Sequence, residues 1–337
     1  MVNKQGVGLA LSGGGSRAIA FHYGVFEAFH ELKIDQKIDV VSAISGGAVI
    51  GALWAVHSKD WDTFCQKTDL ILKDGLESPL KNLKQYCSLI FNRGIDADEL
   101  ATVLDKMIFH GTKLAEIPDR PTLILNAADL KTGTNFKFSR EICGSYKTGG
   151  HALPSLSLSQ AVAYSASYPL IFLPKRLKLP NDQYVYLTDG GAYDCLGANA
   201  LMPDKDEKIS ILNQSCETLI VSDASSSDYV EEKDLAKSIL GGLKGSYATA
   251  TRRIKSLIYN KMFILYKNKE IPYLGTIKMD STHPDLQLGW GEEELALVNR
   301  YKTDFNPVEG KALQLLKDKG KQSAKFIIKE HLGHLIN

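Results

Sequence analysis

DVVSAISGGAVIGALWAV, residues 39–56, has the pattern of a strand, a tight turn at Ser45 and a helix. Its opening residues are mostly apolar and partly β-branched, which predicts a buried strand. Gly46 and Gly47 follow, where a sharp turn favours residues without a Cβ. The nearly all-apolar run from Ala48 onward predicts a buried helix. The stretch therefore places a serine hydroxyl beside a helix N-terminus, either as a nucleophile or as a simple helix cap.

A second strand–turn–helix pattern precedes this one and contains three consecutive glycines. Residues 6–11 predict a buried strand and residues 18–32 a helix, and between them lie Gly13, Gly14 and Gly15. Successive glycine N–H groups can point at one negative atom, so the loop is a candidate anion site. It matches neither a Walker loop nor a dinucleotide fingerprint. A purely structural tight turn is the alternative.

The two units together predict an α/β fold with a parallel sheet. In such a sheet the loops that follow the strands lie along one edge. We therefore expect the three glycines to approach Ser45, where their amides could stabilise an oxyanion.

The carboxylate that could serve as the base lies much further along the chain. Asp189 follows a short predicted strand and precedes Gly190 and Gly191, which let the backbone bend and a substrate approach. A carboxylate is a weak base toward an alcohol, so it can activate Ser45 only if the oxyanion is strongly stabilised. One oxyanion donor is typically worth about 3–4 kcal/mol. Arg17 could add charge or hold the glycine loop, and an ordinary β-turn aspartate is the alternative for Asp189.

The composition indicates an ordinary globular protein of the reduced cytoplasm. The chain has 337 residues, a net charge of +1 and 44% hydrophobic residues, which argues against a nucleic-acid partner. It shows no secretory signal, no run long enough to span a membrane and no spacing typical of metal ligands. The cysteines form no CxxC pair and are odd in number, which argues against a disulfide scaffold. They are Cys65, Cys87, Cys143, Cys195 and Cys216.

One stretch combines basic and apolar residues. Residues 243–269 carry seven Lys or Arg side chains interleaved with large apolar ones. Such a segment could make a peripheral contact with an anionic membrane. A surface helix with a solvated basic face is the alternative.

Three of these motifs, in this order, resemble the patatin-like phospholipase family. They are the GGGSR loop at residues 13–17, the elbow at Ser45 and the DGG motif at residues 189–191. Two smaller pieces agree, AAD at residues 127–129 and SASYPLIFLP at residues 165–174, and a helical tail closes the chain.

The resemblance implies a three-layer α/β/α fold with a mainly parallel central sheet, forming one domain over residues 1–337. The motif-bearing core would cover about residues 7–200 and a helical C-terminal part about residues 230–337. It also implies a cofactor-independent enzyme that hydrolyses acyl esters of phospholipids or related lipids. Ser45 would be the nucleophile and Asp189 the base, and the oxyanion loop would consist of Gly13, Gly14 and Gly15.

The elbow departs from the family pattern at one position. The family usually has Gly-x-Ser-x-Gly, whereas this chain has Ala43 at the first glycine position. Because alanine is small enough for close packing, we expect an altered but functional elbow. Ser42 is a rival nucleophile, but it lies inside the predicted strand.

Other functions are compatible with parts of the pattern. An α/β-hydrolase triad could combine Ser45 with Asp189 or Asp223 and with His283, but that fold usually places several strands before its nucleophile. His22 and His151 are further candidate bases. The same acyl-enzyme could transfer its acyl group to an acceptor other than water. A non-enzymatic protein that binds phosphate or a nucleotide at the glycine loop would use Ser45 only as a helix cap.

Overall fold

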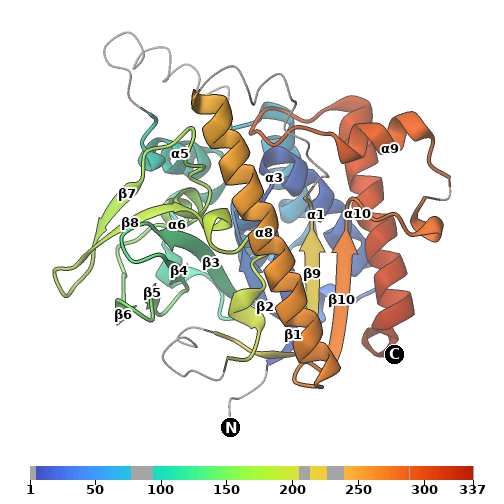
Figure 1. The fold of residues 1–337 in the computed structure, drawn as a ribbon, viewed down its shortest axis with the longest axis horizontal. Helices are drawn as coiled ribbons and strands as arrows, with labels where there is room; N and C mark the ends of the chain where they lie inside the picture. The colour runs from blue at the N-terminus through green and yellow to red at the C-terminus, as the bar shows by residue number, and fades with distance from the viewer. Residues whose placement is uncertain (1–4, 77–93, 205–212, 226–238, 288, 337) are drawn as a thin grey trace.

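A computed structural model of the chain describes residues 5–76, 94–204, 213–225, 239–287 and 289–336. In this part of the chain ten strands form one mixed sheet, with the order β10-β9-β1-β2-β3-β4-β5-β6 (Figure 1). Off this path, β8 pairs with β3 and β7 pairs with β8. The strands are β1 (Gln5–Leu11), β2 (Ile38–Ala43), β3 (Thr122–Asp129), β4 (Thr134–Phe138), β5 (Cys143–Ser145), β6 (Gly149–His151), β7 (Lys175–Lys178), β8 (Tyr184–Asp189), β9 (Cys216–Asp223) and β10 (Tyr273–Lys278).

The central part of the sheet is parallel, as predicted. Strands β10, β9, β1, β2 and β3 run in one direction, and β4 to β8 extend the sheet with antiparallel pairs. The register explains how distant motifs meet. Ala43 pairs with Leu125 of β3, and two residues further along β3 Ala127 pairs with Asp189. The end of β8 therefore lies level with the turn that follows β2.

The helices lie on both faces of the sheet. They are α1 (Gly15–Glu31), α2 (Gly46–His57), α3 (Trp61–Asp74), α5 (Ala97–Leu104), α6 (Leu158–Ser165), α8 (Ile239–Lys267), α9 (Glu292–Asn299) and α10 (Gly310–His331). Short 3₁₀ turns are η1 (Asp35–Lys37), η3 (Leu114–Glu116), η4 (Gly190–Ala192), η5 (Asn199–Leu201), η6 (Pro284–Leu286) and η7 (Gly333–Leu335), and η2 (Asp105–Phe109) is a π-helical turn.

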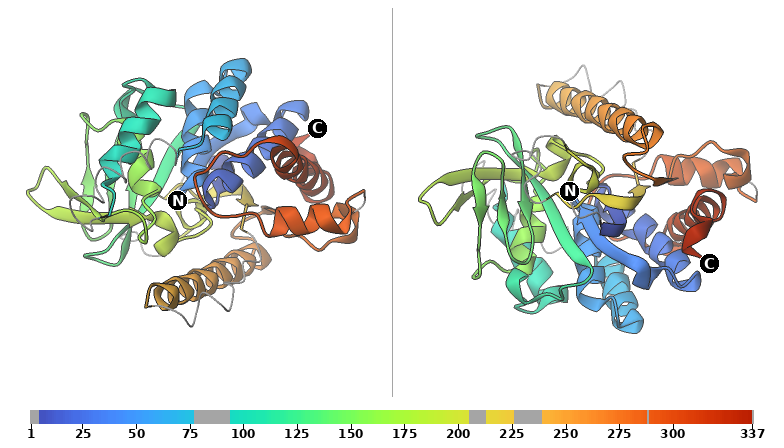
Figure 2. Two further views of the ribbon diagram at one scale, coloured as in Figure 1. Left: turned by 90° about the horizontal axis from the view of Figure 1, so that it is seen from above. Right: turned by 90° about the horizontal axis from the view of Figure 1, so that it is seen from below.

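The alternation of apolar residues along the strands produces two hydrophobic cores. Leu9 and Leu11 belong to the larger core, which α1, α2, α3 and α10 cover, whereas Ala10 between them faces the smaller core. Ile258 and Met262 of α8 bury themselves in that smaller core. Figure 2 shows the result, with α8 on one side of the sheet and α1, α3 and α10 on the other. The predicted three-layer α/β/α architecture is confirmed.

The C-terminal segments join elements from the start of the chain. β9 and β10 extend the sheet from β1, and α10 packs against α1. A Cβ at Gly320 would lie 2.1 Å from the Phe21 carbonyl oxygen, so the glycine lets the two helix backbones approach. The sequence predicts helices for this region, and β10 is an element that it does not predict. Cys87 and residues 230–238 of the predicted helical part lie outside the described residues.

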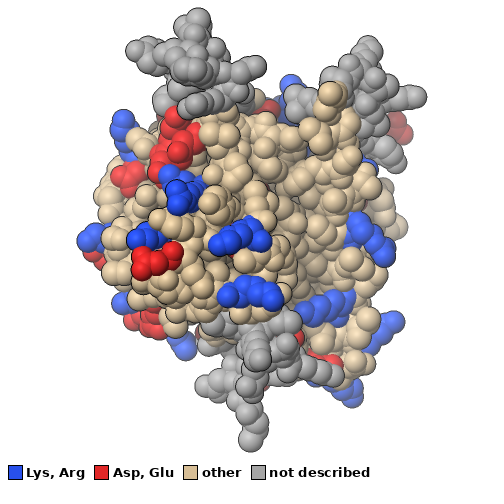
Figure 3. Space-filling view, turned by 60° about the vertical axis from the view of Figure 1, so that its left-hand side comes forward, with Lys and Arg blue, Asp and Glu red and all other residues tan. Residues whose placement is uncertain are grey.

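Charged side chains of both signs are spread over the face in Figure 3, as the small net charge implies. Among the described helices, none has the length and mean hydropathy needed to cross a bilayer.

Candidate active site

Ser45 occupies a strained turn between β2 and α2. Its φ is 53° and its ψ is −124°, a conformation that non-glycine residues rarely adopt. Such strain costs of order 1–3 kcal/mol and is common at functional sites. The Ser45 N–H donates to the Ser165 hydroxyl oxygen at 3.2 Å, and its side chain is nearly buried. The turn therefore holds one serine hydroxyl at the edge of the sheet in a fixed direction.

The glycine loop packs directly on this turn. A Cβ at Gly13 would lie 3.1 Å from the Ser45 Cβ and 3.7 Å from its Oγ. A Cβ at Gly46 would lie 2.3 Å from the Gly15 carbonyl oxygen, and one at Gly47 would lie 2.5 Å from the Ser12 carbonyl oxygen. The structure thus brings the two predicted strand–turn–helix units together through contacts that only glycine permits.

Two Gly→Ala variants should distinguish the effect of this close contact from the general effect of replacing a glycine. In Gly47→Ala the new Cβ would meet the Ser12 and Leu11 carbonyl oxygens at 2.5 and 2.6 Å. We expect the free energy of unfolding to fall by about 2–3 kcal/mol, measured by denaturant titration. Gly242→Ala is the matched control, because Gly242 lies in α8 with nothing within 4 Å of the new atom. It should be neutral or stabilising, and equal losses in both variants would contradict this explanation.

The alanine that departs from the family pattern fits without displacing the turn. Ala43 is fully buried at the end of β2. A Cβ at Gly51 of α2 would lie only 3.1 Å from the Ala43 Cβ. The missing side chain at Gly51 therefore makes room for the extra methyl group at Ala43.

The amides of the glycine loop differ in their hydrogen bonding. The Gly13 N–H donates weakly to the Cys195 carbonyl at 3.4 Å, and the Ser16 N–H donates to the Asp304 carbonyl at 2.7 Å. Between them, the Gly14 and Gly15 N–H groups have no acceptor among the described residues. Both glycines have positive φ, 144° and 60°. The loop therefore offers two adjacent N–H groups at the N-terminus of α1, where the helix dipole favours negative charge.

Buried polar side chains hold the loop in place. The Ser12 hydroxyl accepts from the Ala224 N–H at 2.8 Å. His22 lies beneath the loop, where burial lowers its pKa to about 4, so it is neutral at pH 7. Its Nε2–H can then donate to the Ser12 carbonyl at 3.0 Å, while Nδ1 accepts from the Ser222 hydroxyl at 2.8 Å.

The Arg17 guanidinium, also buried, donates to the Ala224 carbonyl at 3.1 Å and to the Tyr301 carbonyl at 2.6 Å.

Asp189 ends β8 beside Ser45 and is almost completely buried. Its Oδ1 accepts from the Gly191 N–H at 2.8 Å, and its own N–H donates to the Ser167 carbonyl at 2.9 Å. Burial raises the pKa of the Asp189 carboxyl to about 6, although the Gly191 N–H and the Ser45 side chain act to lower it. A carboxylate with this pKa is ionised at pH 7 and is a stronger base than an ordinary aspartate.

Two tyrosines that sequence reasoning missed lie next to Asp189. Tyr168 and Tyr247 form an edge-to-face pair with ring centroids 5.4 Å apart. Burial and then the charge of Asp189 raise the pKa of each phenol. The Tyr247 hydroxyl lies 3.9 Å from the position of a Cβ on Gly191. Tyr247 belongs to α8, so the basic segment 243–269 reaches the site through this side chain, and no local sequence signal indicated it.

Ser42, the rival nucleophile, has a structural role. It is fully buried, and its hydroxyl donates to the Gly197 carbonyl at 2.6 Å while accepting from the Asn126 amide at 2.9 Å. The same Asn126 amide donates to the Ala43 carbonyl at 3.2 Å, and the Asn126 carbonyl accepts from Ser165 at 2.6 Å. These bonds fix the strand that leads into the Ser45 turn.

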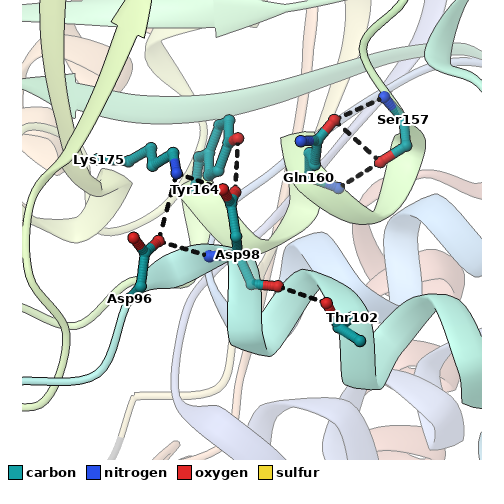
Figure 4. A network of polar contacts seen from close by, with 7 residues as sticks. All are labelled: Asp96, Asp98, Thr102, Ser157, Gln160, Tyr164 and Lys175. Atoms are coloured by element: carbon teal, nitrogen blue, oxygen red, sulfur yellow. Dashed lines mark hydrogen bonds and ion pairs between the residues drawn. The ribbon is translucent and has the colours of Figure 1, made fainter.

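Helix α6, which carries Ser165, is anchored at both ends of its outer face. Ser157 and Gln160 form a capping box at its N-terminus (Figure 4). The Tyr164 hydroxyl donates to Asp98 of α5 at 2.8 Å, and Lys175 pairs with the same carboxylate. The network therefore ties α6 to α5 and holds Ser165 under the Ser45 amide.

The histidines proposed as alternative bases have partners elsewhere. His283 lies half-exposed before η6, where its ring packs on Phe326 and its Nδ1 lies 3.7 Å from Asp285. His151 bonds the Thr148 carbonyl on the β5–β6 hairpin. His22 lies under the glycine loop as described above. Within the described ranges, no group of His, Cys, Asp or Glu side chains has an arrangement that could hold a metal ion.

Comparison with known proteins identifies a family whose model matches the chain. A family model described as patatin-like phospholipase matches residues 9–202. No curated protein matches the chain significantly.

Among solved structures, the fold is similar to that of human GIVD cytosolic phospholipase A2. The structure of that enzyme with methyl γ-linolenyl fluorophosphonate has 14% sequence identity and a TM-score of 0.56, and the match covers 98% of this chain. Another structure of the same enzyme has 12% identity and a TM-score of 0.54 over 95% of this chain. The chain spans only 59–61% of the length of these proteins. At this identity the similarity establishes the fold alone.

Proposed function

The chain belongs to the patatin-like phospholipase family, and on that premise we propose that it is a serine hydrolase that cleaves acyl esters of phospholipids or related lipids. The observation that carries the proposal is the strained Ser45 turn beside a buried Asp189 whose pKa is about 6. A helix-capping serine needs neither the strain nor the buried carboxylate. A phospholipase A or lysophospholipase reaction fits this site best.

In the proposed reaction the side chains of the site have the following roles. Ser45 Oγ attacks the ester carbonyl carbon while its proton passes to the Asp189 carboxylate. The carbonyl oxygen becomes an oxyanion that accepts from the Gly14 and Gly15 N–H groups, helped by the positive end of α1. Asp189 returns the proton to the leaving alcohol as the carbon–oxygen bond breaks. A water molecule then attacks the carbonyl carbon of the acyl-serine while Asp189 takes a proton from it. The bond between that carbon and Ser45 Oγ breaks as Asp189 returns the proton to Oγ, which releases the fatty acid and restores the serine.

The remaining site residues would act through these groups. Arg17 and His22 would position the glycine loop, and Gly46 and Gly47 would let it approach the nucleophile. Gly190 and Gly191 would turn the chain after Asp189, since a Cβ at Gly190 would lie 2.3 Å from the Asn126 carbonyl oxygen.

A covalent probe tests the proposal. A fluorophosphonate should form one stoichiometric adduct, located at Ser45 by mass spectrometry, and the protein should release fatty acid from phospholipid substrates. The absence of an adduct in folded protein would refute the nucleophile and favour the non-enzymatic binding protein. An adduct with acyl transfer but no hydrolysis would favour an acyltransferase.

His283→Ala distinguishes the dyad from a triad. We expect this variant to retain most of the turnover, because the His283 contacts are with Phe326 and Asp285 rather than with the site. Turnover of a soluble ester is the measurement. A loss comparable to that of Ser45→Ala would instead show that His283 is the base.

We also propose that the chain forms a single domain and acts in the cytoplasm. Support for one domain comes from β9 and β10, which extend the sheet that β1 begins, and from α10, which packs on α1. Support for a reducing compartment comes from the described cysteines, all of which are free. They are Cys65, Cys143, Cys195 and Cys216.

A further inference from the structure

Helix α8 has an unusual distribution of side chains. It spans Ile239–Lys267 and contains six Lys or Arg residues and no Asp or Glu. Large apolar side chains on its surface include Ile239, Leu243, Leu257 and Ile264, which are 87%, 55%, 50% and 58% exposed. Leu243, Ala250, Leu257 and Ile264 recur at intervals of seven and so form one stripe along the helix. Together with Ile239 near the N-terminus of the helix, these four residues are called the α8 stripe, which thus consists of Ile239, Leu243, Ala250, Leu257 and Ile264.

The buried side of α8 attaches the helix to the rest of the protein, and the stripe takes no part in this attachment. Ile258, Met262 and Leu265, spaced as neighbours on one helical face, pack into the smaller core. The Tyr259 hydroxyl donates to the buried Asp223 at 2.9 Å, and Lys255 lies 3.5 Å from the same carboxylate. The helix is therefore attached to the sheet without the stripe, whose exposed apolar area contributes nothing to this attachment.

We propose that the α8 stripe docks the protein on an anionic lipid bilayer. An amphipathic helix at an interface inserts apolar side chains between the headgroups, while Lys and Arg contact anionic lipid. Lys244, Arg253 and Lys267 are exposed along α8 and supply that charge. Because α8 carries basic side chains and no acidic ones, it is complementary to a negatively charged surface and would be repelled by a positively charged one.

The location of α8 favours a bilayer over a protein groove. Figure 2 shows α8 as the outermost described helix on its side of the sheet, and Ile239, Leu243, Leu257 and Ile264 are exposed on it. The face that is toward the viewer in Figure 1 lies at the right of Figure 3. There the surface shows Lys and Arg side chains in blue among tan residues, with few Asp or Glu side chains in red. At 1.5 Å per residue the helix is about 40 Å long, which suits contact with an extended flat surface.

Docking by α8 would also place the site next to its substrate. The Tyr247 hydroxyl of α8 lies 3.9 Å from the position of a Cβ on Gly191, and Cys195 Sγ approaches the Thr251 carbonyl of α8 at 3.3 Å. Ser45 is only 8% exposed. A bilayer held on α8 would therefore meet the protein at the helix that contacts Gly191, two residues after Asp189. In this respect alone the inference rests on the proposed function, since it assumes a lipid substrate.

Vesicle binding tests the docking surface without depending on turnover. We would use the full chain carrying Ser45→Ala and sediment it with vesicles of phosphatidylcholine alone or mixed with phosphatidylglycerol. Binding should be at least tenfold stronger to the anionic vesicles and should weaken as salt is raised. Equal binding to both vesicles, or binding to neither, would overturn the proposal.

Paired variants locate the contact. Leu257→Ser/Ile264→Ser should reduce binding to anionic vesicles at least tenfold, since each loses a methylene-rich side chain from the interface. The matched control is Leu70→Ser/Ile336→Ser, because these side chains are 38% and 44% exposed on the other side of the sheet. It should bind like the parent. Arg253→Gln/Lys267→Gln should weaken binding about fivefold per charge and flatten the salt dependence.

Two further measurements separate this inference from the proposed function. With Ser45 intact, the stripe variant should retain fluorophosphonate labelling and turnover of a soluble ester but lose turnover of vesicle lipid. If labelling fails while vesicle binding follows the predictions, the enzyme proposal falls and the docking surface stands. A stripe variant that binds vesicles normally but changes oligomeric state would assign the stripe to contact with a second copy and overturn the docking proposal.

Discussion

Replacing Ser45 by alanine should lower kcat/KM for ester hydrolysis by about 10⁴-fold or more, as expected for loss of a nucleophile. The substitution removes only Oγ, and the Ser45 N–H can still donate to Ser165. Alanine also tolerates the same backbone turn about as well as serine. The variant should therefore unfold at nearly the same temperature as the parent and should lose the fluorophosphonate adduct completely.

Ser42→Ala is the control for this result. Ser42 lies in the strand that leads to the turn, and its hydroxyl bonds Gly197 and Asn126. Losing these bonds should reduce the free energy of unfolding by about 1–3 kcal/mol, yet labelling at Ser45 and most of the turnover should persist. If Ser45→Ala kept near-normal turnover, the nucleophile assignment would be wrong whatever the control showed.

The parts of the site that sequence could predict are encoded locally. The Ser45 turn needs glycines within the next two residues, and the oxyanion loop is three consecutive glycines between a strand and a helix. Both patterns are contiguous, so they can be recognised without knowing the rest of the fold. Two such units in succession predict parallel strands, and the sheet confirms this for β1 and β2.

The parts that sequence could not predict depend on contacts between distant segments. Arg17 bonds the carbonyls of Ala224 and Tyr301, and backbone carbonyls have no signature in a sequence. β10 consists of only six residues between two helical regions, and its pairing with β9 rather than local propensity makes it a strand. Tyr247 contacts the site because the apolar side of α8 packs on the sheet in one particular register.

The pKa of Asp189 is also a property of the fold. A sequence places a carboxylate before two glycines, but burial raises its pKa to about 6. We therefore expect kcat/KM of the wild type to fall as the pH drops below about 6, because the protonated carboxyl cannot accept the Ser45 proton. Asp189→Asn should lose about 10⁴-fold in kcat/KM and should show no such acidic limb. An apparent pKa near that of an ordinary aspartate would contradict a buried base.

The same burial makes the ionised Asp189 unfavourable for stability, and the sign of the effect can be tested. Its pKa rises from 3.8 to about 6 on folding, so the folded state holds the proton more tightly than the unfolded state. Stability is therefore lost as the pH rises from about 4 to about 6, by up to about 3 kcal/mol at 1.36 kcal/mol per pKa unit. The Asp189→Asn variant has no carboxyl group to ionise at this position, so it does not lose this stability. Its melting temperature should be higher than that of the wild type at pH 8, and the difference should become smaller as the pH is lowered toward 4.

Asp194→Asn is the matched control for that stabilisation. Asp194 is equally buried, and burial raises its pKa as well, but its two oxygens accept from the N–H groups of Leu196, Gly197 and Asn199 at 2.8–2.9 Å. An asparagine there would turn an NH₂ group toward a backbone donor and should lower the melting temperature at pH 8. Opposite shifts at two buried aspartates five residues apart would mark Asp189 as a carboxylate whose ionisation opposes folding, as expected if it is retained for catalysis. Destabilisation in both variants would show that Asp189, too, serves mainly to satisfy backbone donors.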